Sequence, residues 1–463
     1  MNKIYKVIWS HVKQCYVVTS ELAKAHGRTS IGGASRLAVA ALTAFVLTAG
    51  VTSVGLAADK DIVDKGAQPI AYDISPANDG TNIAIGKNAK VFIGSGTQES
   101  MLSFGEEVNK SGLKMDIKNN DGAKKNLPEA IAAGTNSYAR TGSIEIGAHT
   151  LDKNKIAIGD TTADQLRQFG VASTTLGTNS YTGGGFATTI GSYNVQTNQY
   201  EAKNFLDAFN ATKNAFSTVI GTFNSNESMT GSSSSGVANM ISGMANKVTN
   251  SNGAIVMGAG NSVKESSSFI DASPYSTHFD SVADMQKALM DGVASSAGGA
   301  TLVIGGANKA ENTLKTQILG VNNTVTGTED TPADYNMIDG FNTTVNGASH
   351  LYTIGTNNTI TNAKNTILFG DGYKNASGLT DSVIIGNNRV KGDEKAEFAY
   401  FNNQKNIVSI GNKNVLNHTD GSISIGNNNF MWRSGGQPEK YGYDTGNVAI
   451  GNNTYINSYA NQG

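Results

Sequence analysis

The sequence predicts an all-β fold: a parallel β-solenoid built from repeated coils of about 15 residues. Three observations lead to this prediction. A motif of apolar–any–apolar–Gly recurs between residues 81 and 457, many of its glycines lie 15 residues apart, and an Asn usually follows within two residues. The chain also contains 54 Gly but only 6 Pro, and only 16% of its residues are charged. Such a composition suits an extended repeat better than an ordinary globular domain.

Residues 1–58 have the features of an export signal. Two arginines precede an apolar run at residues 37–49, and small residues follow it. This order of charged, apolar and small residues is typical of a secretory signal, and the run is shorter than the ~20 residues that a membrane-spanning helix needs. We therefore predict cleavage near Ala57 or Ala58, which removes Cys15, the only cysteine.

Residues 59–80 are a lead-in to the repeats. In a unit such as Ile423–Gly426, the two flanking apolar residues point to one face of a strand, and we expect that face to be buried in the solenoid. Glycine allows positive φ at the end of the strand, and the neighbouring Asn tolerates a left-handed backbone and suits a ladder of stacked side chains. The predicted repeat turns are Gly86, Gly147, Gly159, Gly191, Gly221, Gly258, Gly305, Gly320, Gly355, Gly370, Gly386, Gly411, Gly426 and Gly451.

Each unit is expected to hold two short strands, because a second apolar residue such as Val325 or Ile360 follows the glycine by about five places. One unit is not stable alone. Burial of an apolar side chain stabilises by roughly 1.5–3 kcal/mol, whereas ordering the backbone costs roughly 1–2 kcal/mol per residue. Only stacked coils that share a core and ladder hydrogen bonds reverse this balance.

Several segments interrupt the repeats, and we predict short helices at residues 201–209 and 279–293 because apolar residues there fall on one helical face. Two roles remain open for these segments: contact with a ligand on the exposed surface, or capping of the roll and filling of a groove between chains. Residues 458–463 are expected to be a truncated end. The predicted insertions are residues 95–133, 197–217, 263–300, 391–405 and 430–446.

The residues after position 58 carry 35 − 6 = 29 basic and 37 − 1 = 36 acidic side chains, a net charge of −7. A mildly acidic body argues against nucleic acid as a partner. The four histidines of this part lie far apart in sequence, and no phosphate loop, metal-binding motif or nucleophile motif occurs. We therefore predict no catalytic, cofactor-binding or metal-binding residues and expect that the chain is not an enzyme. The sequence identifies no ligand-binding residues.

Two segments resemble one family. Residues 1 to about 28, with Trp9, Cys15 and Glu21, resemble the extended signal peptide region of large secreted proteins of Gram-negative bacteria. The repeats at residues 81–457 resemble the YadA-like head repeats of trimeric autotransporter adhesins. The resemblance implies a left-handed parallel β-roll, a homotrimer with chains packed side by side, export across the inner membrane, and display at the cell surface on a stalk held by an outer-membrane β-barrel.

The sequence departs from that family because no heptad stalk and no run of barrel strands appears in it. Membrane attachment is therefore expected only through a C-terminal anchor outside this sequence. The resemblance implies an adhesin head that attaches to host matrix, host-cell receptors or other bacteria through the avidity of many copies. The alternatives are a structural spacer below a separate binding tip, a monomeric solenoid passenger of another type V secretion system and, last, an enzyme built on the solenoid.

Overall fold

The computed structural model describes residues 5–10, 15–20, 68–69, 82–87, 89–92, 107–108, 114–115, 130–150, 170–198, 214–228, 235–266, 282–295, 301–374, 376–388, 401, 403–417, 419–434 and 446–459. The chain divides into two units, Met1–Asp61 and Ile62–Gly463. In the first unit, β1 (Tyr5–Ser10) pairs antiparallel with β2 (Cys15–Ser20). Among the described helical residues there is no stretch with the length and apolar character of a membrane span.

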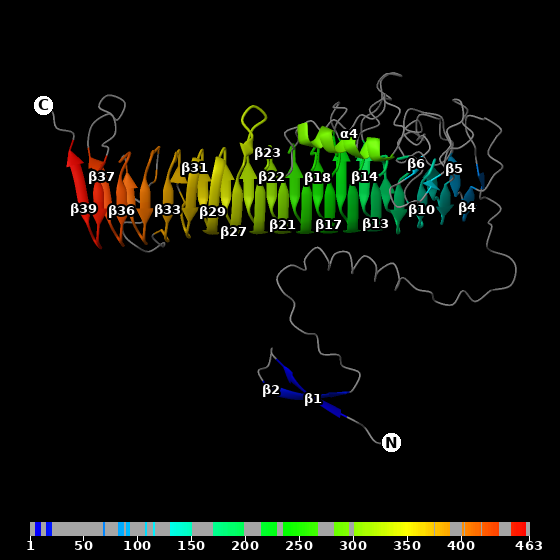
Figure 1. Ribbon diagram of the computed structural model, residues 1–463, viewed down its shortest axis with the longest axis horizontal. Coiled ribbons are helices and arrows are strands. Elements are labelled where there is room, and N and C mark those ends of the chain that lie inside the picture. Colours follow the sequence, from blue (N-terminus) through cyan, green and yellow to red (C-terminus); the bar gives the residue numbers. More distant parts are fainter. Residues whose placement is uncertain are drawn as a thin grey trace. The chain divides into compact units, whose positions relative to one another are not determined.

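The second unit is a β-roll of stacked coils, and Figure 1 shows its strands side by side along its length. Every neighbouring pair on its first face is parallel and in register, so the predicted parallel β-solenoid is confirmed. The first-face strands are β4 (Ile83–Ile85), β8 (Ile131–Ala133), β10 (Ile144–Ile146), β11 (Thr174–Leu176), β13 (Thr188–Ser192), β15 (Thr218–Thr222), β17 (Met240–Met244), β19 (Ile255–Ala259), β21 (Leu302–Gly306), β24 (Gln317–Val321), β27 (Met337–Phe341), β29 (Ser349–Thr356), β31 (Lys364–Phe369), β33 (Val383–Ile385), β34 (Val408–Ile410), β36 (Ile423–Ile425) and β38 (Val448–Ile450).

The second face consists of three separate parallel sheets rather than one. Except for β3, each of its strands follows a first-face strand in the chain, so most of the described coils supply one strand to each face. In order they are β3 (Gln68–Pro69), β5 (Lys90–Phe92) and β9 (Tyr138–Arg140); then β12 (Tyr181–Thr182), β14 (Val195–Asn198), β16 (Ser225–Ser228), β18 (Lys247–Thr249), β20 (Ser262–Lys264), β22 (Lys309–Glu311), β25 (Thr324–Thr326), β28 (Thr344–Asn346), β30 (Thr359–Thr361) and β32 (Ala376–Ser377); and finally β35 (Val415–Asn417), β37 (Phe430–Ser434) and β39 (Tyr455–Tyr459).

Few other elements are described. The strands β23 (Thr313–Leu314) and β26 (Ala333–Asp334) line a short third side, where β26 also pairs with the start of β29. Two further strands, β6 (Glu107–Val108) and β7 (Lys114–Met115), pair antiparallel. The helix α4 (Val282–Ser295) lies in the chain between β20 and β21, where the sequence predicts a helix.

Most coils turn at three corners, where residues adopt left-handed backbone conformations. Corner A lies two residues after the repeat glycine, as at Asn342 with a φ of 53°. Corner B lies seven residues after it, as at Gly347 with a φ of 63°, and corner C lies five residues before the next glycine, as at His350 with a φ of 53°. The first face runs from corner C to corner A. Corner B is therefore the corner that does not border the first face.

The core corrects one expectation from the sequence. The middle residue of each first-face motif, and not the flanking pair, faces the interior: Ser424 is fully buried, whereas Ile425 is 39% exposed. The same holds in the coil of Ile384, which is buried, and Ile385, which is exposed. Side chains alternate along a strand, and two faces packed closely leave room for one inward side chain per short strand. The expected burial of Ile423 and Ile425 inside the roll was therefore wrong.

The interior changes character along the roll. A long apolar cluster runs from Val219 to Ala449, and a smaller one contains Val91 and Ala132. Between them the inward positions of the first face are polar: Glu145, Thr175 and Thr189. Hydrogen bonds replace apolar contacts there, with Thr175 Oγ1 2.7 Å from Thr182 Oγ1, which donates to Thr189 Oγ1 at 2.7 Å, and Gln196 Nε2 donating to Thr189 Oγ1 at 3.0 Å.

The looped segments are shorter than the predicted insertions. The strand β8 lies within residues 95–133, β20 begins one residue before residues 263–300, and β37 lies within residues 430–446. The helix predicted at residues 201–209 falls outside the described residues. These strands carry few of the flanking Ile and Val residues by which the sequence motif was recognised.

Candidate interaction surfaces of the roll

The repeat glycines form a continuous column along the first face. Those of the sequence prediction that the structure describes have φ values between 111° at Gly320 and 159° at Gly147. Parallel pairing aligns each glycine with the next, as Gly191 with Gly221. A Cβ atom on Gly191 would lie 1.8 Å from the carbonyl oxygen of Gly221, so close stacking of coils excludes a side chain. Gly159 and the predicted cleavage residues, Ala57 and Ala58, lie outside the described residues.

The predicted repeat turns omit Gly340, which pairs with Gly320 and Gly355. They also omit three further glycines of this column, Gly134, Gly177 and Gly243, whose φ values are 128°, 133° and 125°. They follow Ile-Ala-Ala, Thr-Thr-Leu and Met-Ile-Ser, which lack the pair of flanking branched residues. A different signal identifies them, because an Asn or Ser stands three residues after each one, at Ser137, Ser180 and Asn246.

A buried ladder of Asn side chains runs beside the glycine column. The amide of Asn246 illustrates it: Nδ2 donates to Asn224 Oδ1 at 3.0 Å and to the Gly258 carbonyl at 2.8 Å. Its Oδ1 accepts from the backbone N–H of Asn261 at 3.1 Å. Each amide thus ties its own coil to both neighbours. The ladder contains Asn194, Asn224, Asn246, Asn261, Asn308, Asn323 and, with Thr343 interposed, Asn358.

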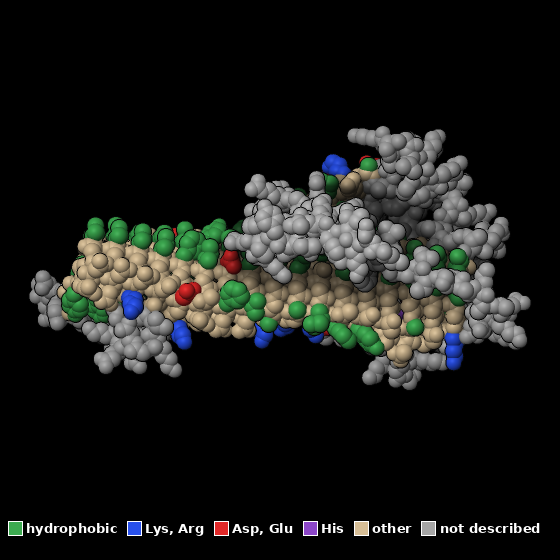
Figure 2. Space-filling view, turned by 90° about the horizontal axis from the view of Figure 1, so that it is seen from below, with side chains coloured by type: hydrophobic (Ala, Val, Ile, Leu, Met, Phe, Trp, Pro, Cys, Tyr) green, Lys and Arg blue, Asp and Glu red, His purple; other side chains and the backbone are tan. Residues whose placement is uncertain are grey.

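The flanking residues of the motif form an apolar stripe on the outside of the first face. Ile146 is 47% exposed and Ile354 is 46% exposed, and Figure 2 shows hydrophobic side chains in a row along one edge of the C-terminal half. Asp339 is the one charged residue at these outward positions of the described strands. We call the following residues the outward stripe: Ile83, Ile85, Ile144, Ile146, Met240, Ile255, Ile304, Tyr352, Ile354, Ile385, Ile410, Ile423, Ile425, Val448 and Ile450.

Most of the long intervening segments leave the roll at corner B. The described chain stops at Asn198, Ser228, Ser266 and Ser434, each seven or eight residues after a repeat glycine. Apart from α4, it resumes four to eight residues before the next repeat glycine. The turn after Gly327 also lies at corner B. These segments therefore depart from the corner that does not border the outward stripe.

Aromatic side chains stack between coils at two of the corners. At corner A, Tyr193 and Phe223 have ring centroids 5.1 Å apart and are 48% and 61% exposed. At corner C, Tyr335 stacks on His350 at 4.7 Å, and Lys315 Nζ lies 4.6 Å from the Tyr335 ring centroid. Bulky residues rarely adopt a left-handed conformation. Their presence at these corners indicates that the stacked side chains help to hold neighbouring coils together at the surface.

Among the described residues, the second face is interrupted in two places. We call the gap between β9 and β12 the first breach and the gap between β32 and β35 the second breach. In each case the described residues stop two or three positions after a repeat glycine, at Asn388 and at Thr150. The first face continues past both breaches, because β10 pairs with β11 and β33 with β34.

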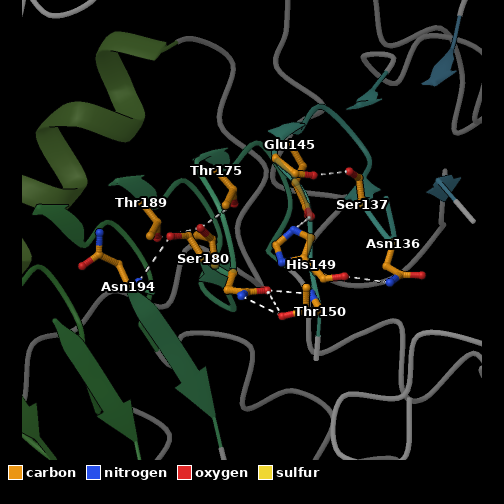
Figure 3. Close-up of polar contacts among 12 residues, drawn as sticks. Asn136, Ser137, Glu145, His149, Thr150, Thr175, Ser180, Thr189 and Asn194 are labelled. Carbon is orange, nitrogen blue, oxygen red and sulfur yellow. Dashed lines mark hydrogen bonds and ion pairs between the residues drawn. The ribbon is translucent and has the colours of Figure 1, made fainter. Parts of the chain in front are cut away.

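Buried polar side chains fill the first breach. Glu145 extends inward from β10, and its Oε1 lies 2.6 Å from His149 Nε2, an ion-pair contact without hydrogen-bond angles. Figure 3 shows these two side chains directed at one another, with Thr175 and Thr189 beside them. Tyr138 and Arg140 of β9 and Tyr181 of β12 are also buried, with exposures between 3% and 7%.

Burial dominates the electrostatics of the first breach. It raises the pKa of the Glu145 carboxyl above its ordinary value of 4.5, although His149 and the backbone of Tyr138 act in the opposite direction. The pKa of the Tyr181 phenol is also raised, first by burial and then by the charge of Glu145. An ionised carboxylate is therefore costly at this position.

The second breach is filled by aromatic rings. Tyr373 and Phe401 lie with ring centroids 5.8 Å apart and are buried. The Tyr373 hydroxyl donates to the Gly386 carbonyl, and burial raises the pKa of this phenol. The described residues thus place a carboxyl group and an imidazole at the first breach and two aromatic rings at the second.

Two comparisons with known proteins give matches. Residues 1–51 match the extended signal peptide of type V secretion systems. Over 108 residues, the chain is 37% identical to the autotransporter adhesin EhaG of Escherichia coli O157:H7. The match covers 23% of this chain and 6% of that protein. No solved structure matches the chain.

These findings agree with the parallel roll. The signal peptide is the part of the sequence prediction that the comparisons confirm most directly, because the match covers residues 1–51 of the predicted segment 1–58. The adhesin likeness supports an adhesin role. By its signal peptide and its adhesin likeness, the chain is similar to autotransporter adhesins and is secreted by the type V route to the cell surface.

Proposed function

We propose that the chain is the head of a cell-surface adhesin that attaches to host matrix, host cells or other bacteria, and that it acts by binding rather than by catalysis. The observation that carries the proposal is the regular roll together with the adhesin likeness. A stack of coils joined by ladders is a stiff support for surface residues. Many copies on one cell then give strong attachment even where each contact is weak.

The head is a homotrimer in this proposal, with the outward stripe against the axis. Monomeric proteins rarely expose a continuous apolar patch of this kind, and association buries it. A threefold axis parallel to the roll places equivalent coils of the three copies at the same height along that axis. The departure of insertions at corner B supports this arrangement, since that corner does not border the stripe and stays free for ligands.

Sedimentation of the exported chain tests the assembly. The wild-type chain is expected to sediment as a trimer, and the double variant Ile385→Asp with Ile410→Asp as a folded monomer, because the carboxylates stand on the outward stripe. Thr344→Asp with Thr359→Asp is the matched control, since both residues lie on the outside of the second face and their change should leave a trimer. A monomeric wild type, or a trimeric stripe variant, contradicts the proposal.

A binding assay tests the adhesin role. Bacteria that display the chain are expected to adhere to matrix proteins or cultured host cells, or to each other. A variant in which a short Gly-Ser linker replaces residues 435–445 keeps β37 and β39. It therefore tests whether this segment is needed for binding while the fold is retained. Adhesion to none of these surfaces would favour the spacer instead.

A further inference from the structure

We propose that the second face of the roll binds a sulfated polysaccharide of the host matrix, laid along the line of coils. This inference rests on the proposed adhesin function and names the class of its ligand. One row of outward residues carries it, each four places after a repeat glycine. We call these residues the basic row: Ser225, Lys247, Ser262, Lys309, Thr324, Thr344, Thr359 and Lys374.

Parallel pairing aligns the basic row in one line. Lys309, for example, is in register with Ser262 of the coil before it and with Thr324 of the coil after it. The Thr359 N–H donates to the Tyr373 carbonyl, which places the following Lys374 at the end of the same line. Six steps of about 4.8 Å spread the three lysines over about 29 Å. An extended sugar chain can therefore contact all three.

The basic row carries positive charge and hydroxyl groups but no carboxylate. Three of its residues are lysines, and the other five are Ser or Thr. Lys309 and Lys374 are exposed and form no ion pair with a described residue. Lys247 Nζ lies 3.0 Å from the Glu227 carboxylate, so its charge is partly neutralised. Figure 2 shows Lys and Arg side chains at intervals along one long edge of the roll, away from the row of hydrophobic side chains.

The acidic side chains near the basic row are already engaged. Glu227 and Glu311 are the two acidic residues in the described strands of the sheet from β12 to β32. Glu311 Oε1 lies 2.7 Å from Lys264 Nζ. At corner A, Asp371 Oδ1 accepts hydrogen bonds from the Thr356 N–H at 2.7 Å and hydroxyl at 2.8 Å. A chain of anionic groups along the basic row thus meets uncompensated positive charge.

This chemistry favours a sulfated polysaccharide over a nucleic acid. Ammonium groups attract sulfate, and Ser and Thr hydroxyls can donate to sulfate oxygens or accept from sugar hydroxyls. Single-stranded nucleic acids are held mainly by aromatic platforms, and the row contains no aromatic side chain. A duplex is bound through more phosphate contacts than three lysines supply. The row also lies on a different face from the outward stripe, so it stays accessible in the proposed trimer.

Calorimetric titration of the purified exported chain with heparin fragments tests the row. The wild-type chain is expected to bind at ~0.15 M salt and to bind more weakly as the salt concentration rises. The double variant Lys309→Gln with Lys374→Gln should bind at least ~5-fold more weakly, because each exposed charge contact contributes a few-fold to affinity. Circular dichroism shows whether each variant keeps the fold.

The matched control is Lys364→Gln with Lys405→Gln, which removes the same charge from two exposed lysines on the third side, in line with Thr380. It should change the affinity by less than ~2-fold, because salt screens charges farther away than about 8 Å. Thr344→Asp with Thr359→Asp, which should leave a trimer, is expected to weaken binding, since carboxylates in the row repel sulfate.

Three outcomes overturn the proposal: a wild-type chain that does not bind heparin, equal losses in the two lysine pairs, or tighter binding of duplex DNA than of heparin. The adhesion assay keeps this proposal separate from the adhesin role. Adhesion to host cells without heparin binding rejects only the basic row. Adhesion to no surface rejects the role itself.

Discussion

At the scale of single residues, the roll depends on positions where a side chain does not fit. The glycine column lies inside the stack, where each glycine touches the carbonyl of the next coil, so sterics and backbone conformation both require glycine. Corner A also has a positive φ, but of about 50–60° at its non-glycine residues, a value that other residues can adopt, and it has open space around it. Ala245 and Ala307 occupy that corner with φ values of 55° and 54°. Positive φ alone therefore does not require glycine in this protein.

Two glycines of adjacent coils test this distinction. Gly355→Ala should destabilise the roll by roughly 2–4 kcal/mol, because the new Cβ would lie 2.0 Å from the Gly370 carbonyl and the coils must move apart. Gly372→Ala should cost at most about 1 kcal/mol, since no atom lies within 4 Å of its Cβ position. Urea unfolding followed by circular dichroism measures both. Equal losses would mean that strain, and not the contact between coils, sets the requirement.

At the scale of elements, hydrogen-bonded side chains connect each strand to the next. The buried Asn ladder satisfies glycine carbonyls and backbone N–H groups that would otherwise be left without partners at the turn after each first-face strand. A second, exposed row at corner A includes Asn342, whose Nδ2 donates to Asn357 Oδ1 at 2.7 Å. Water can replace bonds in the exposed row but not in the buried one.

The two rows should therefore differ in energy. Asn246→Ala is expected to cost roughly 1–3 kcal/mol, because it leaves the Gly258 carbonyl and the Asn261 N–H with unmet bonds in the interior. Asn342→Ala removes a similar bond at the surface and should cost less than about 1 kcal/mol. Denaturation midpoints of the two variants give the comparison. A larger loss at Asn342 would show that the exposed row carries the stacking.

At the scale of the whole roll, stability is expected to vary along its length. Coils contact mainly their neighbours, so a repeat protein unfolds in blocks that follow local strength. The block from Val219 to Leu368 has an apolar interior and an unbroken second face. The coils from Gly147 to Gly191 have polar inward residues on the first face and contain the first breach.

Unfolding should therefore begin at the N-terminal coils. In a urea series followed by hydrogen exchange, residues 131–190 are expected to lose protection at lower urea than residues 301–370, by a difference of at least ~1 kcal/mol in opening free energy. Val303→Ser should narrow this difference by placing a polar group in the apolar block. A single transition at all residues would mean that the first face alone makes the roll cooperative.

The sequence by itself determined the parallel repeat, the spacing of its coils and the export signal. Glycines at regular steps indicate a backbone contact that recurs from coil to coil. The requirement for glycine is therefore repeated along the sequence and can be recognised there. The signal peptide is equally local, since charge and apolar length define it. The helix at residues 282–295 was also predictable from its apolar stripe.

Only the tertiary structure decided which side of each strand is inside. Alternation in Ile423–Ile425 shows that two residues share a face, but the sequence does not say whether that face meets the core or another molecule. It also gave no sign of where the second-face pairing is interrupted among the described residues, because such an interruption is visible only when the strands on both of its sides are placed. Glu145 lies inside because pairing with β8 and β11 fixes the orientation of its strand. The residues around it come from coils that lie before and after the interruption of the second face.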